Sequence, residues 1–214
     1  MAKSPALNRQ AYIDAALEVV AEVGVDKLSM RKVASRLGVS AMAMYKHFPN
    51  KEELLTATLD EVIARADVLP ETELPWAQWV EKVARGMYDT LCEEISWVPF
   101  LGSMRLGSQA AAVTDAFVKR LTTEGFTVEQ AVRAYFSVIQ VMIGAVCLHS
   151  SISAEPKAED GKLTPLTLRY LENVDPDRLR IAPALDELAK LDQLDIGLPM
   201  IIDSLRATLA ASNI

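Results

Sequence analysis

The spacing of apolar residues is the feature that most limits what this chain of 214 residues can fold into. Apolar side chains recur three and four positions apart almost throughout, and no segment sustains the alternation of a half-buried strand. Half of the residues are apolar and 24% are charged, which excludes a disordered tail and a disulfide scaffold. The sequence therefore predicts an all-α protein whose core needs no covalent staples.

Short polar residues predict where the first helices begin, because the side chain of such a residue can accept a backbone N–H of the first helical turn. Gly24 and Gly38 then mark two helix ends, since glycine adopts the left-handed conformation that stops a helix. We expect helices at 9–23, from Ser29 to Gly38, from Ser40 to His47, and at 51–66. The four capping residues are Asn8, Ser29, Ser40 and Asn50.

Longer helices should follow the proline-bounded acidic turn 70–75. The segment 128–150 is apolar nearly all round and so must be covered on several sides. Together with 197–211 it suits a four-helix interface between two copies of the chain, although a single intramolecular core is the alternative. The most apolar run, 134–148, is about five residues short of a bilayer span, so we expect a buried helix and no membrane partner. The expected helices are 76–94, 97–106, 109–124, 128–150, 165–173, 176–191 and 197–211.

The net charge of −7 hides an uneven distribution. Residues 1–51 contain eight Lys and Arg against four Asp and Glu, a net charge of +4. The other 163 residues contain 14 against 25, a net charge of −11. A basic head on an acidic body concentrates any attraction for phosphate at one end of the molecule.

The segment Ser29 to Phe48 has the pattern of a helix-turn-helix, in which two short helices are joined by a tight turn. Ala34 is small where the helices cross, Gly38 forms the turn, and Ser40 caps the next helix. Met44 and Phe48 should point inward. This arrangement predicts a DNA-binding head.

With its continuation to Leu55, the head resembles that of the tetracycline-repressor (TetR) family of bacterial transcriptional regulators. The later chain resembles the tetracycline class of that family in Leu106-Gly107, Gly125-Phe126-Thr127, the segment 144–148 and the segment 197–209. In the head, the resemblance runs from Ile13 to Leu55 and is carried by Ala16, Gly24, Met30-Arg31, Val33-Ala34, Leu37-Gly38-Val39-Ser40, Tyr45, His47-Phe48 and Asn50-Lys51-Glu52-Glu53-Leu54-Leu55.

The resemblance implies that the helix Ala41 to His47 enters the major groove of double-stranded operator DNA. Apolar residues face the bases there and offer no bidentate hydrogen bonds, so Lys46 and Arg31 would have to supplement contacts with thymine methyl groups. The alternatives are that His47 packs beside Phe48 and that Arg31 lies with Lys32 on a solvated face. The expected DNA-binding residues are Arg31, Ser40, Ala41, Met42, Ala43, Tyr45, Lys46, His47 and Lys51.

We expect a DNA-binding domain at 1–51, a connecting helix at 51–66, and a ligand-binding and dimerisation domain at 67–214. Large, adaptable side chains in the second domain could line a small-molecule pocket, although at helical spacing such residues are often plain core. The expected ligand-binding residues are Val83, Met87, Leu91, Trp97, Phe100, Met104, Arg105, Phe117, Tyr135 and Ile139.

One position departs from the tetracycline class. The resemblance implies a metal-chelating histidine immediately before Leu106-Gly107, and this chain has Arg105 instead. Magnesium–tetracycline chemistry is therefore not expected, and the effector should be a small apolar molecule bound without metal or cofactor. Arg105 could pair with an acidic ligand or form an ordinary surface ion pair.

The remaining composition argues against catalysis. The chain has two histidines and two cysteines, and it lacks HExxH, GxSxG and a phosphate-binding glycine loop. Cys92 and Cys147 should be buried free thiols in a reducing bacterial cytoplasm. We expect a ligand-responsive repressor that binds palindromic DNA as a homodimer, nucleoid-associated when bound. A helical protein-binding module without DNA affinity is the alternative.

Overall fold

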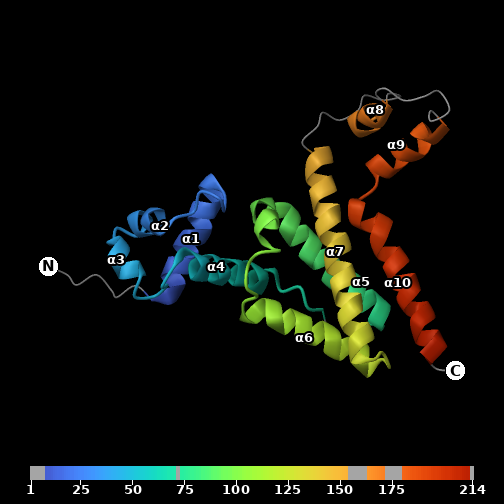
Figure 1. Ribbon diagram of the computed structural model, residues 1–214, viewed down its shortest axis with the longest axis horizontal. Helices are drawn as coiled ribbons and strands as arrows, with labels where there is room; N and C mark the ends of the chain where they lie inside the picture. The colour runs from blue at the N-terminus through green and yellow to red at the C-terminus, as the bar shows by residue number, and fades with distance from the viewer. Residues whose placement is uncertain (1–7, 71–72, 154–162, 172–179, 213–214) are drawn as a thin grey trace. The chain divides into compact units, whose positions relative to one another are not determined.

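The computed structural model describes residues 8–70, 73–153, 163–171 and 180–212, and all regular structure in these ranges is helical (Figure 1). The described residues form two compact units. The first contains the chain up to Asp67 and the segment Ser96–Val113, and the second contains the rest. By contacts, the first unit thus takes in more of the chain than the predicted head.

Four helices build most of the first unit, and each begins where a capping side chain stands. They are α1 (Arg9–Val23), α2 (Met30–Arg36), α3 (Ala41–Met44) and α4 (Lys51–Ala66). Asn8 and Asn50 accept the amides of Ala11 and Glu53 at 2.9 and 2.8 Å. Ser29 and Ser40 accept the amides of Lys32 and Ala43, both at 3.3 Å. The predicted caps are confirmed.

Two glycines end helices in the backbone conformation that side chains disfavour. Gly24 has φ +83° after α1, and Gly38 has φ +66° in the turn between α2 and α3. A residue with a Cβ would be strained at these φ values. The helix-turn-helix turn therefore depends on Gly38, as predicted.

The core of the first unit includes a side chain from far along the chain. Trp97 is fully buried in the same cluster as Val33, Met44, Phe48 and Leu54. Because this tryptophan packs among the helices of the head, the segment that carries it belongs to the first unit.

The expected α-helix 97–106 is wrong. The chain forms a 3₁₀-helix, η1 (Ile95–Phe100), and then turns in which Leu101 and Ser103 donate to the carbonyls of Val98 and Phe100. Pro99 lies inside η1 and has no N–H for an α-helical ladder. Burial of Trp97 then holds the segment in this tighter form.

The second unit is a bundle in which α7 lies against both α5 and α10 (Figure 1). Trp79, Phe117 and Tyr135 form an edge-to-face series in its core, with ring centroids 5.9 and 5.3 Å apart. Its helices are α5 (Trp76–Glu93), α6 (Ser108–Thr123), α7 (Val128–Ser153), α8 (Pro165–Leu171), α9 (Ala182–Lys190) and α10 (Gln193–Ser212), of which α6 begins in the first unit.

One expected helix start is not tested, and another is wrong. The start expected at 176 lies outside the described residues, among which α9 begins at Ala182. The helix α10 begins at Gln193 rather than 197 because Asp192 caps it, accepting the Leu194 amide at 3.0 Å. Arg85 of α5 pairs with Asp192 at 3.0 Å and also with Asp195, which fixes this first turn.

The helix α7 is longer than the apolar run that predicted it. Its 26 residues contain an 18-residue stretch with a mean hydropathy of 1.8, so the helix is long and apolar enough to cross a membrane by length and composition. Core helices of soluble proteins share these properties, and α7 packs on α5 and α10. The prediction that both cysteines are buried is wrong, because Cys147 is exposed on the side of α7 that carries Gly144 and Leu148.

Candidate nucleic-acid interface

A tight turn joins α2 to α3 and fixes the orientation of the second helix. Within this turn the Val39 amide donates to the Ala34 carbonyl at 3.0 Å. At the end of α3, the amides of His47 and Phe48 both donate to the Met44 carbonyl, at 2.8 and 2.9 Å. Met44 and Phe48 are fully buried, as predicted. Since both are anchored in the core, the four residues of α3 have a fixed outward face.

The expected helix runs to His47, but α3 ends at Met44, and most of the residues predicted to contact DNA lie on the outward side of α3 or in the turn 45–47 that follows it. Met42 and Tyr45 are 72% and 51% exposed, which is unusual for large apolar side chains. Lys46 is exposed beside them, whereas Ala41 and Ala43 are half-buried. Ser40 and Arg31 are also exposed, at the beginnings of α3 and α2 respectively.

His47 and Lys51 are less free than the other predicted contacts. The His47 ring lies 4.7 Å from the Tyr12 ring, tilted by 35°, so this half-buried histidine packs on α1. Lys51 is also half-buried, and its Nζ donates to the Asp26 carbonyl at 3.4 Å. Their contacts with phosphate stay predictions.

The positive charge of the head is partly neutralised within the head. Arg36 pairs with Glu18 at 3.2 Å and with Glu22, and the hydrogen bond that Glu22 accepts from it raises the pKa of the guanidinium. The cations left on the α2–α3 side are therefore Arg31, Lys32 and Lys46, all exposed. This focuses the electrostatic attraction for phosphate near α3.

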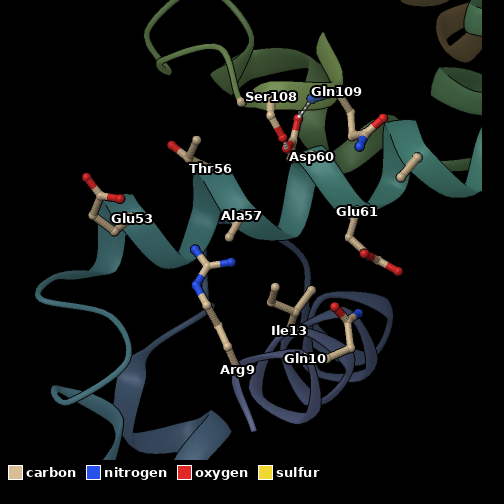
Figure 2. A pocket seen from close by; sticks show the side chains of 12 residues that line it. Arg9, Gln10, Ile13, Glu53, Thr56, Ala57, Asp60, Glu61, Ser108 and Gln109 are labelled. Carbon is tan, nitrogen blue, oxygen red and sulfur yellow. Dashed lines mark hydrogen bonds between the residues drawn. The ribbon is translucent and has the colours of Figure 1, made fainter. Parts of the chain in front are cut away.

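Two residues of this unit were not singled out by sequence reasoning. The Arg9 guanidinium lies 4.6 Å from the centre of the Phe48 ring, in a cation–π contact behind α3. Asp60 of α4 accepts three hydrogen bonds at the start of α6. Both residues line a cavity of about 320 Å³, shown in Figure 2. The one sequence signal for the role of Asp60 is its polar side chain within an amphipathic helix.

The expected effector residues are divided between the two units. Trp97, Phe100, Met104 and Arg105 belong to the first, where Phe100 and Met104 pack on the core that holds Trp97. The second unit contains the other six, of which Val83 and Phe117 are fully buried, Leu91 and Tyr135 are buried, and Met87 and Ile139 are half-buried. Their role in binding an effector stays a prediction.

Two buried polar atoms of the described residues have no hydrogen-bond partner: Trp97 Nε1 and Tyr88 Oη. Burial of Tyr88 raises its pKa, so the hydroxyl stays neutral. A buried group without a partner costs about 1–3 kcal/mol, and such groups frequently mark a missing ligand or water. Trp97 is one of the predicted effector residues, and Tyr88 follows another, Met87.

Arg105 lies on the surface. Its side chain is 81% exposed, and its Nε is 3.9 Å from the Glu52 carboxylate. A pair this long and this exposed contributes little to stability. The structure therefore has the surface ion pair that the sequence offered as one alternative for Arg105.

The face shared by α7 and α10 in the second unit contains an open groove of about 520 Å³. Met200 of α10, one of its lining residues, is 73% exposed, and Val132, Phe136 and Leu148 of α7 are exposed as well. The groove is lined by Gln130, Arg133, Ala134, Ser137, Met200, Ile201, Ser204, Leu205 and Thr208.

Comparison with known proteins agrees with the geometry of the head. Residues 13–58 match the model of the bacterial regulatory proteins of the tetR family. The tetracycline repressor protein class A from transposon 1721 of Escherichia coli is 30% identical over 202 residues, which are 93% of this chain and 90% of the repressor. The chain belongs to the tetR family of bacterial regulatory proteins. It is a ligand-responsive transcriptional regulator, and proteins of this family are DNA-binding regulators rather than enzymes.

Solved structures resemble the regulator over almost its whole length. A possible TetR family transcriptional regulator from Streptomyces coelicolor is 25% identical, with a TM-score of 0.75, and the match covers 94% of this chain and all of that one. The Q116A variant of TetR from Acinetobacter baumannii, solved with minocycline, is 25% identical, with a TM-score of 0.69 and coverage of 94% and 98%. The all-α, TetR-type fold predicted from the sequence is confirmed.

The family match covers the head of the regulator and leaves out the predicted effector residues. All nine predicted DNA-binding residues, from Arg31 to Lys51, lie within the matched range 13–58. The ten predicted effector residues lie beyond it. The DNA-binding head is thus the part that most clearly follows the family pattern.

Proposed function

We propose that this regulator represses transcription as a homodimer whose α3 helices bind palindromic operator DNA. A small apolar molecule then releases the protein from the DNA. One observation carries the proposal. Ser40 caps α3, Met44 and Phe48 fix it in the core, and Met42, Tyr45 and Lys46 are held outward. A short helix fixed in this way and flanked by exposed cations fits the major groove.

The chemistry of the exposed side chains suggests how the DNA is read. Lys46 and Arg31 are the long donors that can reach a base edge or a phosphate, and Met42 can contact a thymine methyl group. Tyr45, His47 and Lys51 would contact the backbone. Because Ala41 and Ala43 add no hydrogen bonds, part of the sequence preference must come from DNA shape.

Selection of bound fragments from genomic DNA with the purified protein tests this proposal. We expect palindromic fragments, with the two recognition helices about 34–36 Å apart or somewhat more. Lys51→Ala should lower the slope of log K against log salt by about one per half-site, because one phosphate contact is lost. Lys82→Ala, an exposed lysine of α5, is the control and should leave the slope unchanged. Absence of any salt-dependent DNA binding would favour a protein-binding module instead.

A second copy of the chain is the proposed occupant of the α7–α10 face. The exposed side chains of Met200, which lines the groove, and of Phe136 on α7 are those that a four-helix interface would cover. Sedimentation should find a dimer at micromolar concentration, and Phe136→Asp should give a monomer. Leu106→Asp, at a residue that is 67% exposed in the first unit, should leave the dimer intact.

The effector is proposed to be largely apolar, with at least one hydrogen-bond acceptor, and to bind without metal. The apolar side chains support the first property, and the unpartnered Trp97 Nε1 supports the second. Arg105 in place of a chelating histidine supports the third. A thermal-shift screen of apolar compounds should give hits that do not depend on Mg²⁺, whereas Mg²⁺-dependent stabilisation by minocycline would contradict the proposal.

We also infer that the regulator works in the bacterial cytoplasm, on the nucleoid when DNA-bound, without a membrane or a cofactor. The support is the family's soluble, DNA-binding character together with the packing of α7 on α5 and α10. Cell fractionation should recover the protein with the soluble and DNA-bound material. Recovery in the membrane fraction would contradict this inference.

A further inference from the structure

The helix α6 begins at a residue that cannot cap it. Its first helical hydrogen bond runs from the Ala111 amide to the Gly107 carbonyl at 3.0 Å, which puts Gly107 at the N-cap position. Glycine has no side chain to accept the amides of the first turn, and these amides need an acceptor. The cap must therefore come from elsewhere.

Asp60, in the middle of α4, supplies this cap. Its Oδ1 accepts the amides of Gln109 and Ala110 at 2.8 and 3.2 Å, and its Oδ2 accepts the Ser108 hydroxyl at 2.9 Å. Figure 2 shows the carboxylate of Asp60 directed at Ser108 and Gln109. A carboxylate at this position also interacts favourably with the positive end of the α6 dipole. One side chain thus attaches the start of α6 to α4.

The contact is sterically tight. A Cβ added at Gly107 would lie 2.3 Å from both Cγ and Oδ1 of Asp60, which is closer than non-bonded atoms can approach. A Cβ added at Gly102, five residues earlier, would meet nothing within 4 Å. Glycine at 107 is therefore required by the approach of Asp60.

The two helices joined by Asp60 differ in where they lead. The helix α4 begins at Lys51, a few residues after α3, and lies wholly in the first unit. The helix α6 starts in the first unit and continues into the second, where Phe117 and Leu121 are fully buried. A change in the position of α6 must therefore act on α4 through Asp60 or break its hydrogen bonds.

We propose that Asp60 is the positioning residue that couples α6 to the DNA-binding unit. The affinity for DNA then depends on whether Asp60 is bonded to Ser108, Gln109 and Ala110, and bound DNA in turn affects these bonds. This inference rests on the proposed DNA-binding function. Coupling between two sites is reciprocal, so DNA bound at α3 must alter the α6 cap as much as a change in the cap alters DNA binding. The coupling can thus be measured before any effector is known.

The first experiment measures amide hydrogen exchange at Gln109 and Ala110 in the free, full-length protein. Asp60→Ala and Gly107→Ala should each speed this exchange about tenfold or more, since both remove bonds to a charged acceptor. Gly107→Ala keeps the carboxylate, so it guards against an Asp60 variant that fails to fold. Gly102→Ala is the matched control and should change nothing. Unchanged exchange in both test variants would overturn the cap itself.

The second experiment repeats the measurement with a DNA fragment recovered in the genomic selection. Bound DNA should change exchange at Gln109 and Ala110 by threefold or more in the wild type and in Gly102→Ala. That response should vanish in Gly107→Ala and Asp60→Ala, while their Kd for the fragment stays within about fivefold of wild type. A purely structural cap would show no DNA response in the wild type, or the same response in the variants, and either result overturns the coupling.

The two experiments distinguish failure of the proposed DNA-binding function from failure of the Asp60 cap. If the selection recovers no DNA, the proposed function fails and the coupling to DNA fails with it. The exchange of the free protein still decides whether Asp60 caps α6.

Discussion

The four helices of the head and the helices of the second unit begin in different ways. In the head, Asn8, Ser29, Ser40 and Asn50 each cap the helix that follows them in the sequence. The helices α5 and α9 follow Pro75 and Ile181, neither of which makes a side-chain cap bond, and α6 is capped by Asp60 of α4. Only some later helices, such as α7 with Thr127, carry their own cap.

Helix length explains why caps matter most for two helices of the head. The helices α2 and α3 have seven and four residues, and helices this short are unstable unless their ends are satisfied. The helices α5 and α7 have 18 and 26 residues and are held by long packed faces. The head is therefore specified by neighbours in sequence, whereas the second unit depends more on contacts made after folding.

The largest expected effect is the loss of the residue that locks α3. Phe48→Ala should lower the free energy of unfolding by about 3–5 kcal/mol and abolish DNA binding, because Phe48 is fully buried under the recognition helix. Phe117→Ala should cost a similar amount while leaving DNA affinity near wild type. Urea denaturation and DNA titration measure both. Equal loss of DNA binding in the two variants would break the comparison between the units.

Overfilling the two cores should have the next largest effect. Val33 and Val83 are both fully buried, one in each unit. Val83→Trp should cost about 1–3 kcal/mol of stability and alter the response to an effector while leaving DNA affinity near wild type. Val33→Trp should destroy DNA binding. If effector-triggered release survived Val83→Trp, Met87→Ala and Phe117→Ala, the effector does not bind among these residues.

Removing a local cap should have a smaller effect that sharpens the contrast. Asn50→Ala should cost about 1 kcal/mol, because the Glu53 amide loses its acceptor. Pro75→Ala should change stability by less than about 0.5 kcal/mol, since Pro75 makes no side-chain cap bond. Thermal or urea unfolding measures both variants. A cost at Pro75 as large as that at Asn50 would contradict the division between local and tertiary helix starts.

The smallest expected effect is a loss of stability of the second unit at acidic pH. Lys190, followed by the Thr164 amide, lowers the pKa of Asp186 to about 2 from 3.8. The Thr164 amide, in the residue before α8, donates to this carboxylate at 2.7 Å and so joins it to α9, whereas Lys190, 2.8 Å from the carboxylate, lies on α9 itself. Because the folded pKa is lowered, the contribution to stability is complete above about pH 4 and is lost as the pH falls towards 2.

Asp186→Asn tests this acid dependence. Between pH 4 and pH 2 the variant should lose less stability than the wild type, and Asp203→Asn, in an exposed pair with Arg206, is the control. Parallel pH profiles for wild type and Asp186→Asn would show that this carboxylate does not link the two helices.

Most features of the head of this regulator could be predicted from its sequence. Asn8, Ser29, Ser40 and Asn50 cap helices as predicted, Gly38 adopts the left-handed conformation, and Met44 and Phe48 are buried. These outcomes depend on residues only a few positions apart, whose preferences can be read in the order of the chain.

Which distant segments of the chain pack together could be learned only from the tertiary fold. Nothing near Trp97 in the sequence indicates that it enters the core of the head. The cap of α6 comes from Asp60, 49 residues from Gln109, and the first turn of α10 is paired with Arg85, 110 residues from Asp195. A side chain contributes to such contacts through its position in the folded chain, so periodicity and local propensity carry no signal for them.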